Sequence, residues 1–406
     1  MLFFELLQVA VGRRERLSLT PSRSEWQHLY QLSEQHAMQG VCYSAVLRLP
    51  RDQWPCEEDL IDWIWQAQRI AEQNELITQR SVEACERLRS DGFDVCLLKG
   101  QGNARLYGDL GQYRQSGDVD LWCVPHDRPE HHPKRRVIEY VRRRCGSTTL
   151  RYHHIDFPTF SDAEVELHFL PIYLNNPWLN RQLGRWYSEH RDEQMQHHVT
   201  IGGGEVAVPT RSFNLLYQLL HVYKHVFEEG VGLRQMMDYY MVLTDHAQRG
   251  KTGAAEGPRT GAGEGPKAGA AEGPRTGTTE GLRMGAVEAS EAEMIRELHL
   301  ERLAGAVSYV MLTVFGMREE ELPWPASRRQ GIALLSEIMQ TGNFGQFDTR
   351  YDKEASPTGT RSMLHRYWRK TKRNLALAID FPHEGLWEPW FRLYHFFWRT
   401  FDFWKI

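Results

Sequence analysis

The spacing of apolar residues along this chain changes from a helical to a strand-like pattern after about residue 90. Apolar side chains recur at helical spacing over residues 26–49 and 60–89, which predicts two long helical segments. Short apolar runs bounded by turn residues follow at 93–98 and 118–124, and each run predicts a strand. The chain therefore begins with helices and continues into a sheet.

The rest of the central region alternates between the two kinds of element. Residues 101–110 have the pattern of a short helix, and 134–145 have that of a basic helix. Strands are predicted near 150–157 and 164–170, and helices dominate again over 211–248. Strands and helices mixed in this way predict a core of the α+β class.

A glycine-rich repeat interrupts the second half of the chain. Four imperfect octads occupy residues 253–284: GAAEGPRT, GAGEGPKA, GAAEGPRT and GTTEGLRM. Eleven of the 33 glycines fall in the stretch from Gly250 to Gly285, where there is almost nothing apolar to bury. Such a segment cannot offset the entropy lost on ordering, so a disordered linker is predicted. A collagen-like helix is excluded because glycine does not recur at every third position.

These patterns divide the 406 residues into five parts. They are an N-terminal helical region (1–90), a core (91–210), a helical segment packed on the core (211–249), the disordered octad linker (250–290) and a C-terminal helical region (291–406). The aromatic C-terminus, WFRLYHFFWRTFDFW, carries charged residues at intervals and is predicted to be a packing helix. An interfacial membrane helix is the alternative interpretation of this segment.

Composition limits the location of the protein more than its function. No apolar stretch approaches the roughly 20 residues that a membrane span needs, and the N-terminus lacks the order of a secretory signal. Six cysteines are scattered without a C-x-x-C pair, as in proteins whose thiols stay reduced. The sequence thus predicts a cytoplasmic protein with no membrane partner.

The formal net charge of −4 points to no polyanionic partner. One predicted helix is locally basic, with Lys134 near its start and arginines at 142–144, and such a surface could meet RNA. Glu139 lies among these basic residues and no aromatic platform stands nearby. We interpret the helix as a solvated surface, so a nucleic-acid partner is left open but is not indicated.

Carboxylates at alternate positions mark the second predicted strand. Asp118 and Asp120 share one face of it, because side chains two residues apart in a strand point the same way. Glu166 and His168 repeat the arrangement in the strand at 164–170. If the two strands are neighbours, Asp118, Asp120 and Glu166 converge, and a cation must offset their repulsion. Oxygen ligands without cysteine favour Mg²⁺ or Mn²⁺ over zinc.

Groups suited to binding phosphate are predicted close to these acids. Lys99-Gly100 ends the first strand ahead of a short helix, and it supplies a cation and a backbone that a phosphate can approach closely. Arg114 adds a planar guanidinium. A D-x-D motif also occurs in haloacid-dehalogenase-type phosphatases and in sugar-nucleotide glycosyltransferases, where it ends a hydrophobic strand. Asp118 and Asp120 begin a strand instead, which argues against both classes.

The run LLKGQGNARLYGDLGQYRQSGDVDLWCV resembles the signature of the uncharacterised nucleotidyltransferase family within the DNA polymerase β-like superfamily. Members share a strand ending in Lys-Gly, a helix with Ala and Tyr, an Arg and an Asp-x-Asp-Leu strand. The later VELHF is similar to the strand of that family's third acid, which corresponds to Glu166. The resemblance covers about residues 22–245. One departure is that Gln101 follows Gly100, where the wider superfamily has a Gly-Ser pair.

The resemblance implies a polymerase β-like nucleotidyltransferase core, a small mixed sheet with helices, flanked by N-terminal and C-terminal helical regions. It also implies NTP as substrate, with Mg²⁺ or Mn²⁺ bound by Asp118, Asp120 and Glu166. The NMP would pass to an unidentified hydroxyl on a small molecule, a protein or an RNA. Two alternatives stay open: a catalytically inactive nucleotide- or protein-binding module on the same fold, and a phosphodiesterase or phosphatase with the same metal site.

Histidines and basic residues outside the motif are weaker signals. His221 and His225 share a helix face, but the residue after the first is not the Glu of a zinc protease, so zinc is disfavoured. Lys224, His225 and Arg234 are instead candidate nucleotide contacts. A salt bridge between Arg234 and Asp238 is an equally good interpretation of that arginine.

His153 and His154 stand next to each other in the strand predicted at 150–157. Neighbouring side chains in a strand point to opposite faces, so the two rings are not expected to enter one site. We interpret both as ordinary strand residues.

Overall fold

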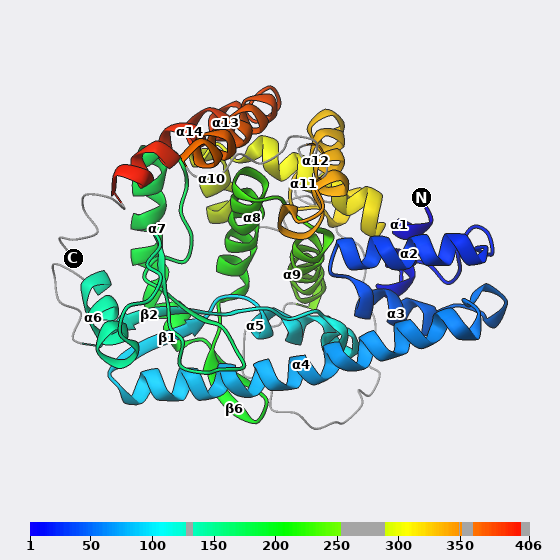
Figure 1. Ribbon diagram of the computed structural model, residues 1–406, viewed down its shortest axis with the longest axis horizontal. Helices are drawn as coiled ribbons and strands as arrows, with labels where there is room; N and C mark the ends of the chain where they lie inside the picture. Colours follow the sequence, from blue (N-terminus) through cyan, green and yellow to red (C-terminus); the bar gives the residue numbers. More distant parts are fainter. Residues whose placement is uncertain (127–132, 253–288, 349, 351–359, 399–406) are drawn as a thin grey trace, which may run out of the picture.

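The computed structural model describes residues 1–126, 133–252, 289–348, 350 and 360–398 (Figure 1). The octad repeats, and with them almost all of the linker predicted at 250–290, lie outside the described residues. The last residues of the aromatic C-terminus, 399–406, lie outside them as well.

One mixed sheet of six strands forms the centre of the fold, in the order β3-β4-β2-β1-β6-β5. Strand β2 lies between β1, to which it is antiparallel, and β4, to which it is parallel. The strands are β1 (Phe93–Leu97), β2 (Val119–Pro125), β3 (His154–Asp156), β4 (Val165–His168), β5 (His198–Ile201) and β6 (Gly204–Ala207). The mixed sheet with its helices confirms the predicted α+β core.

Helices cover the two faces of this sheet, and β2 contributes to both interfaces. Val119 and Leu121 pack in an apolar cluster with residues of α4 (Glu57–Ser90) and α6 (Pro133–Cys145). Trp122 points to the opposite face. Its ring lies 5.8 Å from Phe213 of α8 (Arg211–Glu228) and 6.0 Å from Tyr187 of α7 (Pro177–Gln196). In Figure 1, α4 runs below the sheet, while α7 and α8 rise above it.

The elements expected around the first two strands are present. The helix predicted at 60–89 is α4, and the strands predicted at 93–98 and 118–124 are β1 and β2. The segment 101–110 is only partly α-helical, because α5 (Gln101–Ala104) continues into the 3₁₀ segment η2 (Arg105–Tyr113). Gly108 has φ +56° inside η2 and breaks the helical path there.

Two elements between β4 and α8 had no counterpart among the predicted ones. They are the long helix α7 and the hairpin β5–β6. The hairpin turn uses Gly202 and Gly203, both at positive φ, between two short runs that alternate apolar and polar residues. That is the sequence pattern of a two-residue hairpin turn, so the signal for the hairpin was present.

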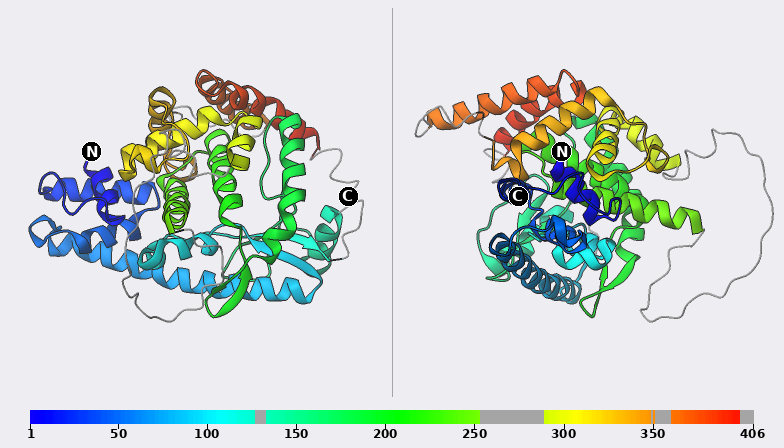
Figure 2. Two further views of the ribbon diagram at one scale, coloured as in Figure 1. Left: turned by 180° about the vertical axis from the view of Figure 1, so that it is seen from behind. Right: turned by 90° about the vertical axis from the view of Figure 1, so that its right-hand side faces the viewer.

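The N-terminal and C-terminal helices pack against each other in one apolar cluster (Figure 2). The side-chain amide of Gln8 donates to the carbonyl of Val314, at 3.3 Å, and so joins α1 (Leu2–Ala10) to α11 (Glu301–Phe315). The N-terminal elements are α1 (Leu2–Ala10), α2 (Arg23–Gln35), α3 (Gln39–Arg48) and the short η1 (Arg51–Gln53). The later ones are α9 (Leu233–Thr252), α10 (Ala289–Glu297), α11 (Glu301–Phe315), η3 (Glu319–Glu321), α12 (Arg328–Thr341), η4 (Asn343–Gly345), α13 (Thr360–Leu377) and α14 (Pro382–Phe397).

The helix pair α13–α14 is attached to the C-terminal end of α8. Arg373 donates to the carbonyl of Val226 at 2.6 Å, and Asn374 donates to that of Phe227 at 2.9 Å. The last carbonyls of a helix have no partner within it, and a cation near them is favoured by the helix dipole. These two side chains therefore fix α13–α14 above the sheet. In the described ranges, no helix combines the length and the apolar character that crossing a membrane requires.

Close packing of α3 on η2 gives a first prediction. A Cβ added to Gly40 would overlap the carbonyl oxygen of Tyr113, whereas a Cβ added to Gly184 of α7 would meet nothing within 4 Å. Gly40→Ala should lower the free energy of unfolding by about 1–3 kcal/mol through overpacking. Gly184→Ala should raise it by about 0.5–1 kcal/mol, because alanine loses less entropy in a helix. Urea denaturation measures both, and equal effects would contradict the contact.

Candidate active site

The register of two parallel strands brings the predicted acids together. Asp120 of β2 pairs with Glu166 of β4, and Asp118 immediately precedes β2. The Lys99 ammonium, at the end of β1, lies 3.0 Å from Asp120 Oδ2 and 3.5 Å from Asp118 Oδ2. Asp120 is almost completely buried. The convergence predicted for Asp118, Asp120 and Glu166 is therefore present in the structure, together with a lysine.

The charges of this group depend on one another. Burial alone would lower the pKa of Lys99, but the charges of Asp118, Asp120 and Glu166 outweigh it and raise that pKa. Burial alone would raise the pKa of Asp120, but Lys99 and His168 hold it well below its usual range. A buried carboxylate that keeps its charge needs such partners. Asp120 therefore stays ionised despite its burial and can bind a cation.

His168 links the two strands at their polar face. Its Nε2 lies 3.0 Å from Asp120 Oδ1 and 3.2 Å from Glu166 Oε2. Burial would lower the pKa of the imidazole, but its hydrogen bonds to Asp120 and Glu166 raise it. The sequence placed Glu166 and His168 on one face of their strand, and the structure confirms that. Their shared contact with Asp120 required the pairing of β2 with β4.

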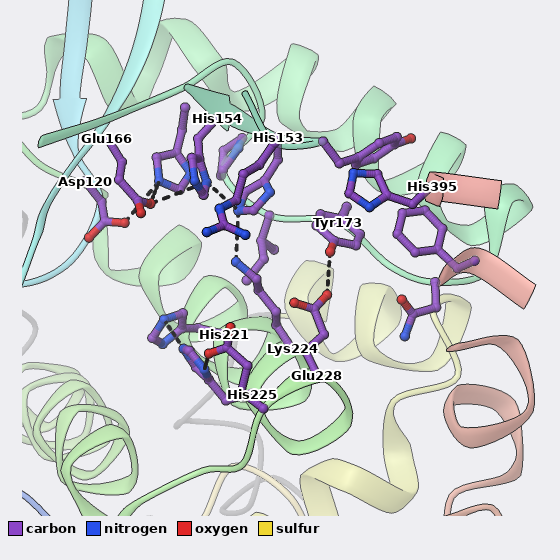
Figure 3. A pocket seen from close by; sticks show the side chains of 18 of the residues that line it. Asp120, His153, His154, Glu166, Tyr173, His221, Lys224, His225, Glu228 and His395 are labelled. Carbon is purple, nitrogen blue, oxygen red and sulfur yellow. Dashed lines mark hydrogen bonds and ion pairs between the residues drawn. The ribbon is translucent and has the colours of Figure 1, made fainter. Parts of the chain in front are cut away.

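The prediction for His153 and His154 is wrong. Both rings line the same pocket, and His154 Nδ1 lies 3.2 Å from His153 Nε2 (Figure 3). Strand β3 begins only at His154, so the alternation expected within a strand does not apply to His153. His154 Nδ1 also lies 3.3 Å from Glu166 Oε2, while Lys224 Nζ lies 2.9 Å from His153 Nε2. Burial lowers the pKa of His154 to about 2, so its ring is neutral at physiological pH.

The acids lie at one end of a cavity of about 380 Å³. Helix α8 lines the middle of it with Lys224, His221 and His225. The two histidines face each other, with Nε2 atoms 2.9 Å apart. Lys224 and His225, predicted as nucleotide contacts, therefore both face this cavity. Lys370 and Phe391, from α13 and α14, line it as well, and His395 of α14 lies at the side away from Asp120 in Figure 3.

An aromatic group from three segments forms the wall beside α14. The rings of Tyr173 and Phe391 stack at 4.9 Å, and Tyr152 meets Phe391 edge-on at 5.1 Å. The Tyr173 hydroxyl donates to Glu228 of α8. The aromatic C-terminus was predicted to be a packing helix, and α14 does pack here. Its position on the wall of the cavity was not predicted.

The structure gives Arg114 a different partner from the predicted phosphate. Its Nε and Nη2 donate to the two carboxylate oxygens of Asp238, each at 2.7 Å. The Tyr107 hydroxyl donates to the same carboxylate at 2.6 Å. Burial would raise the pKa of Asp238, but Arg114 outweighs it and keeps the carboxyl charged. Arg114 does not line the cavity, so it anchors the segment before Asp118 to α9.

The alternative salt bridge between Arg234 and Asp238 is therefore wrong, because Arg114 occupies that carboxylate. Arg234 donates to the carbonyl of Gln115 at 3.0 Å and lies 5.2 Å from the ring of Phe344. It stands at the edge of the cavity without lining it. Gly100 has φ +63°, and a Cβ there would lie 3.5 Å from the carbonyl of Asp118. Glycine thus permits the backbone turn beside the acids.

Several side chains at this site could bind a metal ion. Among the described residues, Asp120, Glu166 and His168 offer ligand atoms within 4.8 Å of one another. The histidines His153 and His154 form a second such group with His168. The first group contains two of the three acids that the sequence predicted as metal ligands, and adds an imidazole that the sequence did not assign to the metal.

The mixed sheet, with Asp118 just before β2, Asp120 within it and Glu166 on the parallel neighbour β4, is consistent with a nucleotidyltransferase core with flanking helices. A family model described as uncharacterised nucleotidyltransferase matches residues 22–255, which is more than half of the chain. The chain belongs to that family. No curated protein and no solved structure shows significant similarity to it.

The buried ion pair of Arg114 and Asp238 generates the second prediction. Arg114→Met leaves the carboxylate of Asp238 buried without its cation, and should lower the free energy of unfolding by about 3–5 kcal/mol. The matched control is Arg135→Met on α6, which removes an exposed pair with Glu139 at 2.7 Å and should cost about 0.5 kcal/mol or less. Both are measured by urea denaturation. A similar small loss in the two variants would contradict the anchoring role.

Proposed function

We propose that this protein transfers an NMP from an NTP to a hydroxyl group of an acceptor, with a divalent metal ion bound by Asp118, Asp120 and Glu166. The observation that carries the proposal is the convergence of these carboxylates on paired strands in a chain of the nucleotidyltransferase family. A protein that only bound a partner would have little use for three carboxylates that repel one another.

The residues present fit a divalent cation. Carboxylate oxygens are the ligands that Mg²⁺ and Mn²⁺ take in phosphate-transferring sites, and the positive charge of Lys99 already lies 3.0 Å from Asp120. When bound, the ion would activate the attacking hydroxyl and neutralise charge on the leaving pyrophosphate. Lys99 and Gly100, just after the end of β1, would meet the phosphates of the NTP.

The other polar groups act on the acids themselves. His168 contacts both Asp120 and Glu166 and so fixes the orientation of their carboxylates. Glu166, half-buried at the cavity, would accept the proton of the acceptor hydroxyl. Its neighbour His154, with Nδ1 3.3 Å from Glu166 Oε2, has a neutral ring that helps to fix the orientation of this carboxylate.

The acceptor would occupy the part of the cavity away from Lys99. Phe391 and Lys370 line this part, and both lie beyond the residues 22–255 that the family model matches. The aromatic surface of this part suits an acceptor with a planar ring. We therefore assign acceptor recognition to α13 and α14, and transfer chemistry to the sheet.

Transfer of label from α-labelled NTPs into a lysate of the host cell, in the presence of Mg²⁺ or Mn²⁺, tests the proposal. Wild-type protein should label a metabolite or macromolecule, whereas the Asp118→Asn, Asp120→Asn variant should reduce labelling to background. Glu139→Gln, an exposed change on α6, serves as the matched control and should keep full activity.

The other functional classes have distinct outcomes in the same assay. Undiminished labelling by the double variant would refute the assignment of the acids. Absence of label with every NTP, from folded wild-type protein, would support the inactive binding module. Release of product from a phosphoester without NTP would support a phosphodiesterase or phosphatase.

The role of the aromatic wall can be tested once the labelled acceptor is in hand. Phe391→Ala should raise the KM for the acceptor about three- to tenfold, as expected for loss of one aromatic contact, and should leave the Kd for NTP unchanged. Trp390→Ala is the control, because that neighbouring ring is 68% exposed. Equal KM values for wild type and Phe391→Ala would show that the acceptor lies elsewhere.

A further inference from the structure

His168 brings a nitrogen atom into the group of carboxylates. Its Nε2 lies 3.0 Å from Asp120 Oδ1 and 3.2 Å from Glu166 Oε2. A second imidazole nitrogen, His154 Nδ1, lies 3.3 Å from the same oxygen of Glu166. All four side chains line the cavity, and only Glu166 is not fully buried. The polar group around Asp120 is thus a mixed set of oxygen and nitrogen donors.

The spacing of these atoms suits a coordination shell. Ligands about 2.0–2.2 Å from one metal ion, at tetrahedral or octahedral angles, lie about 3.0–3.4 Å from each other. The distances of 3.0 and 3.2 Å from His168 Nε2 fall in this range. One imidazole nitrogen carries at most one hydrogen, so it cannot donate fully to Asp120 and Glu166 together. A cation among the three atoms would satisfy all of them.

The surrounding strands hold the donors in place. His168 follows Glu166 by two residues in β4, so both project from the same side of a short strand. Asp120 is held opposite by the parallel pairing of β2. The Nε2 atom of His153, by contrast, already has a hydrogen-bond partner in Lys224 Nζ, at 2.9 Å. The imidazole that the fold offers to the acids is therefore that of His168, with His154 next to it.

We propose that the metal ion bound between Asp120 and Glu166 takes His168 Nε2 as a nitrogen ligand, so that this site prefers a first-row transition-metal ion to Mg²⁺. The inference rests on the proposed function in placing a divalent ion at these acids. Mg²⁺ takes oxygen ligands almost entirely, whereas imidazole nitrogen is a good ligand for the later first-row ions. Mn²⁺, which accepts both kinds of donor, is the probe for the site.

Pulsed EPR of Mn²⁺ bound to the full chain, with no substrate present, tests the ligand directly. Wild-type protein should show a ¹⁴N coupling from a directly bound imidazole, and this should become a ¹⁵N coupling when the histidines are ¹⁵N-labelled. The His168→Asn variant should lose the coupling. His221→Asn should retain it, because His221 lines the same cavity but is paired with His225.

Metal affinities provide the second measurement. Calorimetry should give Mn²⁺ a Kd at least about tenfold below that of Mg²⁺ in the wild type, with the difference reduced mainly through weaker Mn²⁺ binding in His168→Asn. The isotope experiment on wild-type protein shows whether a histidine nitrogen binds the ion even if the variant does not fold, and absence of the coupling would overturn the inference.

The outcomes separate this inference from the proposed function. Mn²⁺ bound without nitrogen coupling, at equal Kd to Mg²⁺, would overturn the His168 ligand and leave nucleotidyl transfer standing. Nitrogen coupling in a protein that transfers no nucleotide would support the ligand and count against the transferase. Failure of Mn²⁺ to bind would overturn the inference.

Discussion

The parallel pairing of β2 with β4 is the constraint on which the rest of the site depends. In this register Asp120 lies opposite Glu166. A slip of one residue would turn Glu166 toward the apolar cluster between the sheet and α4 and bring Val165 or Leu167 to the polar face. The register also concentrates negative charge at one point, which Lys99 offsets and which His168 contacts through Nε2. The pairing of β2 with β4 thus determines both the packing of the apolar face and the position of the acids.

Tertiary contacts outside the sheet complete this site from two directions. On one side, the buried pair of Arg114 and Asp238 ties the segment before Asp118 to α9, so the first acid is held by a structural ion pair. On the other side, Arg373 and Asn374 attach α13–α14 to the end of α8 and bring Phe391 to the cavity. The family segment supplies the acids, and α13 and α14, which lie above the sheet in Figure 1, contribute to the lining of the same cavity.

The cavity combines a charged end with an aromatic end, and its middle is rich in histidine (Figure 3). Contacts of 2.9–3.3 Å connect Lys224 through His153 and His154 to Glu166. Neutral imidazoles can be buried more readily than charged groups, which explains how so many polar side chains are accommodated beside the sheet. The same imidazoles distinguish this site from one built from carboxylates alone.

The sequence by itself determined several elements of secondary structure and which side chains within a strand share a face. Alternation in the β2 and β4 segments placed Asp118 with Asp120, and Glu166 with His168, because strand geometry relates residues two apart without reference to the rest of the chain. Helix α4, strand β1 and the family resemblance were likewise readable from local patterns. The partner of Arg114, the inward turn of His153 and the place of Phe391 were decided only by tertiary structure. Each depends on contacts between distant segments, or on where a strand begins once its neighbour is paired. Neither can be deduced from the local spacing of apolar and polar residues.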